Sequence, residues 1–284
     1  MTAPRVKAAR EVAGACHAGP MKRDVSSRIA LNVAEPAELV FAISASTHYS
    51  PDAERLTATA DGAPLEIAEF ADVHGTRLHR VMAPVGAFVI EYSATIGDGD
   101  TAVADDVERF VYLRPSRYAE SDALAPTAGA EFRGIHGSAD LLTAVSSWVG
   151  THLAYIPGSS LPTDGAARTL LARRGVCRDY AHLCIALLRA LGIPARMVAV
   201  YAPGLSPMDF HAVAEAWVDG TWRAVDATTL APRSSLVRIA TGRDAADTAF
   251  LNVLSGRADL VELTVTATAD VLPNDDVTRL VSIA

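Results

Sequence analysis

The sequence predicts an α+β protein in which a β-sandwich is followed by a second domain of helices and antiparallel strands. Short β-rich segments separated by turn residues occupy residues 28–113, which is typical of an all-β unit. After Gly137 the apolar residues recur at helical spacing. Asp219-Gly220 lies between two apolar-rich runs, a strong signal for a two-residue hairpin. We therefore assign residues 21–115 to the sandwich and residues 116–284 to the second domain.

Composition excludes several classes of protein. The 284 residues are half hydrophobic and carry a formal net charge of −8. No basic patch with interleaved aromatic residues occurs, so we expect a globular protein without a nucleic-acid partner. Only three cysteines are present, Cys16, Cys177 and Cys184. They are too few for a disulfide framework, which suits a reducing compartment.

The first residues and the apolar runs bear on location. Residues 1–20 lack the continuous apolar region of a secretory signal, and we expect them to form a disordered lead. No stretch reaches the roughly 18 apolar residues that a membrane-spanning helix requires. We therefore expect a cytoplasmic protein with no membrane partner, whose oligomeric state the sequence leaves open.

The expected elements follow from the local pattern of each segment. In the first unit, β-rich runs alternate with turn residues. The expected strands are residues 29–33, 38–43, 55–60, 64–70, 76–82, 87–96 and 107–113. Residues 114–132 contain two prolines and are expected to form a linking loop. In the second unit we expect helices at residues 141–153, 163–173 and 177–191, and strands at residues 195–201, 211–218, 221–226 and 259–268.

One cysteine is placed for chemistry by the helix that it begins. Residues 177–191 have one apolar face and Gly175 breaks the preceding segment, so Cys177 falls in the first helical turn. The amides of that turn have no intrahelical partner and the helix dipole is positive there, so both favour a reactive thiolate. Cys184 lies two turns later among leucines and is expected in the core. Alone, this placement does not separate a reactive thiol from a packed one.

A histidine and an aspartate share one face of the expected hairpin. A two-residue turn at Asp219-Gly220 sets a register in which Val213 faces Asp226. His211 then lies on the same face, diagonal to Asp226 at about 7–8 Å. A cysteine nucleophile needs a base and a group that orients the base. Glu215 shares this face but lies roughly 13 Å from His211 along the strand, so Asp226 is the better orienting group.

Separated motifs follow one another in the order cysteine, histidine, aspartate. They are GVCRDYAHL at residues 175–183, LRALGIPAR at residues 188–196, HA at residues 211–212 and VDAT at residues 225–228. Together they resemble the transglutaminase-like superfamily, in particular its bacterial members with a β-rich domain before a papain-like core. The resemblance implies a core in which the cysteine helix packs on an antiparallel sheet.

The same resemblance implies a role for each site residue. Cys177 is implied as the nucleophile that forms a thioester, His211 as general base and acid, and Asp226 as the orienting group. The oxyanion hole would use the Cys177 amide and an upstream donor, for which Trp148 and Tyr155 are both candidates. Ordinary core packing is the alternative for both aromatic residues, and the sequence does not choose between them.

We therefore expect a cysteine-dependent acyl-transfer enzyme acting on peptide or amide bonds, with hydrolysis favoured. Transamidation of protein glutamine shares every step up to the acyl-enzyme and is the main alternative. A non-catalytic interaction module on the same fold is another. A metal site formed by Cys177, Cys184, His211 and His182 is disfavoured because His182 lies well round the helix from Cys177. We expect no metal and no cofactor, since no calcium loop of the EF-hand kind occurs.

Overall fold

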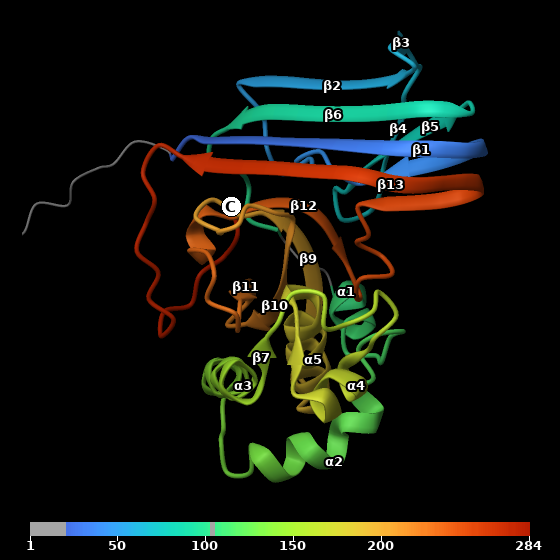
Figure 1. The fold of residues 1–284 in the computed structure, drawn as a ribbon. Coiled ribbons are helices and arrows are strands. Elements are labelled where there is room, and N and C mark those ends of the chain that lie inside the picture. The colour runs from blue at the N-terminus through green and yellow to red at the C-terminus, as the bar shows by residue number, and fades with distance from the viewer. Residues whose placement is uncertain (1–20, 103–105) are drawn as a thin grey trace, which may run out of the picture.

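The structure is a computed structural model that describes residues 21–102 and 106–284. An N-terminal sheet lies above a four-stranded sheet that has helices packed beside it (Figure 1). The lead expected at residues 1–20, which includes Cys16, falls outside the described residues. The α+β class and the order of the two units are as predicted.

Seven strands form the N-terminal sheet. In chain order they are β1 (Arg23–Phe41), β2 (Ala53–Ala60), β3 (Ala63–Pro64), β4 (Ala68–Ala71), β5 (Arg77–Ala83), β6 (Gly86–Ile96) and β13 (Leu251–Ala269). The first half of β1 pairs with β6, the second half pairs with β5, and β13 runs antiparallel to both halves. Phe41 at the end of β1 stacks on Phe88 of β6, with ring centroids 5.7 Å apart. The β1–β13 ribbon therefore folds over its own core and forms the predicted sandwich.

The β1–β13 ribbon turns its corner at Pro36 and Gly256. The register of the ladder shifts on both sides of Pro36, which has no N–H to donate to a neighbouring strand. Gly256 has a φ of +74°, and a Cβ at that position would lie 2.1 Å from the Pro36 carbonyl oxygen. A glycine is therefore required where the two strands approach each other at the corner.

The last strand corrects our domain assignment. We placed residues 116–284 in the second domain and expected a strand at residues 259–268, whereas β13 is longer and pairs with β1. Val265 of β13 is buried in the core of the sandwich. The pairing joins Arg23 to Ala269, and a contact between such distant positions leaves no mark in the local pattern of either segment.

A short helix replaces the strand expected at residues 107–113. This segment instead contains α1 (Asp106–Val111), which has no buried residue. Val107 and Phe110 are both exposed, so the segment lacks the alternation of buried and exposed side chains that marks a strand. Its apolar composition alone suggested the wrong element, because β propensity depends on neighbours to pair with.

A second helix lies within the loop expected at residues 114–132. α2 (Ser121–Glu131) includes Pro126 in its interior. Leu124 and Ala128 are buried one helical turn apart. This apolar stripe packs α2 against the core of the second unit, and its burial outweighs the hydrogen bond that the proline removes.

Three helices and three strands of the second unit lie where they were predicted, whereas the strands at residues 154–155, 174–175 and 237–242 were not predicted. Its helices are α3 (Ser138–His152), α4 (Ala166–Ala172) and α5 (Cys177–Ala190), with a 3₁₀ turn at Arg233–Ser235. A small parallel pair consists of β7 (Ala154–Tyr155) and β8 (Arg174–Gly175). The main sheet has the order β11 (Thr221–Val225), β10 (His211–Val218), β9 (Ala195–Tyr201) and β12 (Val237–Gly242). Within the described ranges, no helix is both long and apolar enough to cross a membrane.

The main sheet is covered on both faces. α5 packs on one face, where its leucines meet small residues such as Ala214 and Ala216 in one core cluster. Further along the same face, Tyr201 joins Ile239 in the core of the sandwich, and the Tyr201 hydroxyl donates to the Ile43 carbonyl at 2.7 Å. The opposite face carries Val198 and Val200, which pack with Ile283 near the C-terminus. The helix that carries Cys177 and the sandwich are therefore held in fixed positions by the same four strands.

The corner of the ribbon can be tested with two glycines that share a backbone conformation. Gly62 also has positive φ, +82°, but nothing lies within 4 Å of a Cβ there. We expect Gly62→Ala to lower the free energy of unfolding by about 1–2 kcal/mol, the cost of the left-handed conformation. Gly256→Ala should cost about 1–3 kcal/mol more, because the methyl group meets the Pro36 carbonyl. Urea unfolding of both variants measures this, and equal losses would contradict the close approach.

Candidate active site

The turn before α5 holds Cys177 through a buried carboxylate. Asp179, in the first turn, accepts a hydrogen bond from the Val176 amide at 2.8 Å and another from the Ser160 hydroxyl. A Cβ on Gly175 would lie 2.6 Å from the Asp179 Cβ, so glycine is needed for this turn to close. Cys177 is the first residue of α5 and remains partly exposed. The local sequence thus places the thiol at an accessible helix N-terminus, as predicted.

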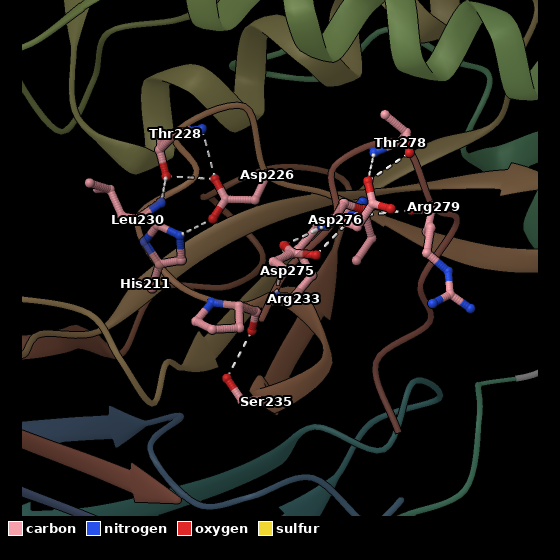
Figure 2. Close-up of polar contacts among 12 residues, drawn as sticks. His211, Asp226, Thr228, Leu230, Arg233, Ser235, Asp275, Asp276, Thr278 and Arg279 are labelled. Atoms are coloured by element: carbon pink, nitrogen blue, oxygen red, sulfur yellow. Dashed lines mark hydrogen bonds and ion pairs between the residues drawn. The ribbon is translucent and has the colours of Figure 1, made fainter. Parts of the chain in front are cut away.

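The hairpin register is the one set by its two-residue turn. Trp217 pairs with Trp222 and Val218 pairs with Thr221. At the open end, the His211 Nε2 atom lies 2.8 Å from Asp226 Oδ2 (Figure 2). The exposed fractions are only 2% for His211 and 5% for Asp226. The pair predicted from strand alternation is therefore formed inside the protein.

A threonine that sequence reasoning missed fixes the Asp226 carboxylate. The Thr228 amide and hydroxyl both donate to Asp226 Oδ1, at 2.9 Å and 2.6 Å (Figure 2). Oδ2 is thereby left for His211. An aspartate with a threonine two residues later is a recognised turn pattern, and this is the signal that could have identified Thr228.

The loop after Asp226 is itself tied down by an arginine. Arg233 binds Asp275 through Nε at 2.9 Å and through Nη2 at 3.0 Å, and Nη2 also donates to the carbonyls of Asp276 and Arg279 (Figure 2). These contacts bind residues 275–279 to the turn that follows β11. The segment that follows Asp226 is therefore tethered to residues 275–279 through Arg233.

The buried pair shifts the acid–base behaviour of both members. Burial alone would lower the pKa of His211, but the Asp226 charge, its hydrogen bond and the Cys177 thiol raise it to about 10. Burial alone would raise the pKa of Asp226, but the His211 charge and the bonds from His211 and Thr228 lower it. Both shifts favour an imidazolium beside a carboxylate at neutral pH.

His211 lies beside the thiol. Its Nε2 atom is occupied by Asp226, the Cys177 side chain is among the groups that raise the His211 pKa, and both residues line one cavity. The buried Nδ1 atom has no hydrogen-bond partner among the described residues. One ring nitrogen of His211 is therefore not engaged by the rest of the described protein.

The structure distinguishes the two aromatic candidates. Tyr155 lies opposite Gly175 in the β7–β8 pair, which places it beside Cys177, two residues after Gly175. Partial burial and the Cys177 side chain raise the pKa of Tyr155 to about 12, so its hydroxyl is a protonated donor at neutral pH. Trp148 instead donates its indole N–H to Glu131 at 3.1 Å and stacks on His152. Cys177, His211, Asp226 and Tyr155 come together, and Trp148 does not join them.

Glu215, the competing carboxylate, is committed elsewhere. Its Oε2 atom accepts from Arg196 at 2.9 Å, and its Oε1 atom accepts from Arg238 at 2.6 Å. Burial alone would raise its pKa, but the Arg238 and Arg196 charges lower it to about 2. Glu215 therefore belongs to a buried ion cluster in the sheet, and Asp226 is the partner of His211.

The side chains of the disfavoured metal site are also in use or inaccessible. The His182 Nε2 atom accepts from the Ala245 amide at 3.1 Å. Cys184 is fully buried, and burial raises the pKa of its thiol. Across residues 21–102 and 106–284, no group of three or more histidine, cysteine and acidic side chains is arranged to hold a metal ion.

The buried pair predicts how stability depends on pH. A raised His211 pKa stabilises the fold below about pH 6.5, the ordinary histidine value, and this contribution is lost as the pH rises towards 10. A lowered Asp226 pKa stabilises above about pH 4 and is lost below it. We expect Asp226→Asn to be most destabilising, relative to the native protein, near about pH 5.5, with a smaller difference near about pH 9.5.

Urea unfolding at these two pH values measures the difference. Asp219→Asn is the matched control, because it removes an exposed carboxylate from the turn of the same hairpin, where asparagine tolerates the positive φ. Asp219→Asn should change the free energy of unfolding by no more than about 0.5 kcal/mol at either pH. A loss for Asp226→Asn that is equal at both pH values would contradict the His211 assignment.

Comparisons with known proteins identify the family of the chain. The transglutaminase-like superfamily model matches residues 127–227. A crystal structure from Cytophaga hutchinsonii, named a "Putative Cysteine Protease", is 36% identical, has a TM-score of 0.82, and aligns over 90% of this chain and 93% of its own. An uncharacterized Mycobacterium leprae protein is 29% identical over 165 residues, which are 53% of this chain and 58% of that protein. An uncharacterized Mycobacterium tuberculosis protein is 33% identical over 143 residues, 45% of each chain.

These relatives differ in how much of them is matched. The chain spans about half the length of the curated mycobacterial relatives, whereas it covers nearly all of the Cytophaga structure. The family model covers the segment that carries Cys177, His211 and Asp226. The chain belongs to the transglutaminase-like superfamily.

Proposed function

We propose that the protein is a cysteine-dependent acyl-transfer enzyme that hydrolyses peptide or amide bonds. The observation that carries the proposal is that His211, whose Nε2 atom lies 2.8 Å from the Asp226 carboxylate, lines one cavity together with Cys177. This is the order of groups that activates a cysteine nucleophile. The name of the Cytophaga relative supports the same class of reaction.

In the first half of the reaction, the Cys177 sulfur attacks the carbonyl carbon of the scissile bond. The C–S bond forms, and the carbonyl electron pair moves to oxygen. The raised pKa of His211 keeps a proton on the imidazole for the departing nitrogen. When the C–N bond breaks, the amine leaves with that proton, and a thioester remains on Cys177.

In the second half, water replaces the amine. The His211 ring, now neutral, takes a proton from the water as its oxygen attacks the thioester carbon. The C–S bond breaks and the acid product leaves. The Cys177 thiolate is then again beside the protonated His211 ring. The buried Asp226 carboxylate stabilises the charged ring in both halves, and Thr228 keeps that carboxylate turned towards His211.

Tyr155 and the Cys177 amide are proposed to bind the oxyanion. Tyr155 lies beside Cys177 across the β7–β8 pair. A substrate oxygen that enters between them would accept from the amide and from the Tyr155 hydroxyl, whose raised pKa keeps its proton in place. Donors already in position before the charge develops need little reorganisation in the transition state.

The thiol and the reaction type can be tested together. Cys177→Ser should lower amide hydrolysis by about 10⁴-fold or more, whereas Cys184→Ser, which changes a buried thiol, should leave it within a few-fold. Iodoacetamide at pH 6 should label the Cys177 peptide, identified by mass spectrometry, faster than it labels glutathione, because an adjacent imidazolium favours the thiolate.

Two results would redirect the proposal. Incorporation of a labelled primary amine that outpaces hydrolysis would assign the protein to the transamidases. Labelling of Cys177 at the glutathione rate, without turnover of any amide, would leave a non-catalytic module on the same fold.

The oxyanion role predicts a specific kinetic effect for Tyr155→Phe. Removal of one such donor should lower kcat by about 10²–10³-fold with little change in KM, because the bond is made mainly in the transition state. Tyr180→Phe is the matched control. Its ring contacts Tyr155, but its hydroxyl donates to the Leu153 carbonyl at 2.9 Å. Equal losses in kcat for both variants would indicate a packing role instead.

A further inference from the structure

A cavity of about 640 Å³ opens beside the thiol and the imidazole. Cys177 and His211 form part of its lining, so whatever occupies the cavity is next to the reacting atoms. Its size falls within the range of small-molecule and side-chain sites, about 300–1,000 Å³. Nothing in the reaction proposed above needs a space of this size, so the cavity calls for a separate explanation.

Three parts of the fold build the wall of the cavity. The main sheet contributes Met197 and Ile239, the segment after β12 contributes Ala246 and Phe250, and the sandwich contributes Leu263 from β13. All five are apolar, and Phe250 is stacked on a second lining ring, Phe210, at 5.4 Å. The wall is therefore a continuous apolar surface formed by both structural units.

The polar groups of the lining are engaged or lie at the edge. Arg178 donates to the Ser160 hydroxyl and the Leu161 carbonyl, both at 3.0 Å. The Thr248 hydroxyl is turned to the Asp244 carbonyl. Arg117, Asp209 and Asn252 are exposed, and Asp209 accepts a hydrogen bond from the Phe210 amide. The ring of Tyr118, a further lining residue, packs on His182. A polar group pushed against the apolar wall would give up its bonds to water without replacement.

We propose that this cavity receives a large apolar side chain of the acyl donor, on the residue whose carbonyl Cys177 attacks. The inference rests on the proposed function and specifies its substrate class: peptides cleaved after residues such as leucine, methionine or phenylalanine. The sandwich then acts in substrate selection, because Leu263 forms part of the wall. Glutamine, the acyl donor of a transamidase, fits this surface poorly since its carboxamide would be desolvated.

Small side chains line part of the cavity, so a larger side chain introduced there tests the proposal. Ala246 lines the cavity but is exposed, so Ala246→Leu should fill part of the cavity without disturbing a core. Ala123, exposed on α2 and absent from the lining, provides the same substitution elsewhere as Ala123→Leu.

The experiment measures kcat/KM for a series of peptidyl aminomethylcoumarins that differ only in the residue before the amide. The native protein should favour phenylalanine and leucine over glutamine by at least about tenfold. Ala246→Leu should lower kcat/KM for phenylalanine by at least about tenfold and for alanine by much less. Ala123→Leu should match the native protein, and all three proteins should react equally with iodoacetamide at Cys177.

The outcomes separate the two proposals. Hydrolysis with glutamine equal to or better than phenylalanine, or an unchanged preference in Ala246→Leu, overturns the apolar-pocket proposal and leaves the hydrolase intact. Absence of hydrolysis across the whole series, with a Cys177 thiol no more reactive than glutathione, overturns the proposed function and this inference with it.

Discussion

The contact between His211 and Asp226 is the constraint on which the site depends. Moving a carboxylate and an imidazolium out of water costs several kcal/mol for each ion unless their remaining hydrogen-bonding positions are filled. Here Thr228 donates two hydrogen bonds to Asp226 Oδ1, and His211 Nε2 lies 2.8 Å from Asp226 Oδ2. The pair exists only if the hairpin keeps its register, because a slip of one residue would move His211 to the opposite face.

Further along β10, a buried ion cluster holds the hairpin in that register. Glu215 lies four residues from His211 on β10 and is held by Arg196 from β9 and by Arg238 from β12. Arg196 also lies over the Trp222 ring at 4.0 Å, and Trp222 pairs with Trp217 across the hairpin. A slipped strand would take the Glu215 carboxylate from the buried Arg238 guanidinium and leave Arg196 with its second partner, Glu108. Loss of the buried Arg238 pair is far more costly than the loss of a surface ion pair. The Glu215 cluster therefore protects the alignment of the His211–Asp226 pair.

What the sequence predicted well is what local chemistry determines. The turn at Asp219-Gly220 sets the pairing within a few residues of itself, and the helix beginning at Cys177 follows from its apolar spacing and from Gly175. Alternation along a strand then suffices to bring His211 and Asp226 together. Thr228 could have been recognised by the same local logic, because its bonds to Asp226 span only two positions.

What the sequence did not reveal depends on contacts between distant segments. The choice between Trp148 and Tyr155 turned on the β7–β8 pair, a two-residue contact without its own pattern. α1 was mistaken for a strand because its apolar residues were judged without knowing that no strand lies beside them. β13 was assigned to the wrong unit because its partner, β1, is at the other end of the chain.

The position of β13 changes how the two units should be understood. A sandwich built only from residues 21–115 would lack the strand that runs along the whole of β1. The chain instead leaves the sandwich, builds the four-stranded sheet, and returns to complete the sandwich with β13. The segment that makes this return, from the end of β12 to the start of β13, passes the thiol and contributes Ala246 and Phe250 to the cavity wall. The segment that leads into the last strand of the sandwich therefore also encloses the site. Neither unit forms the cavity alone.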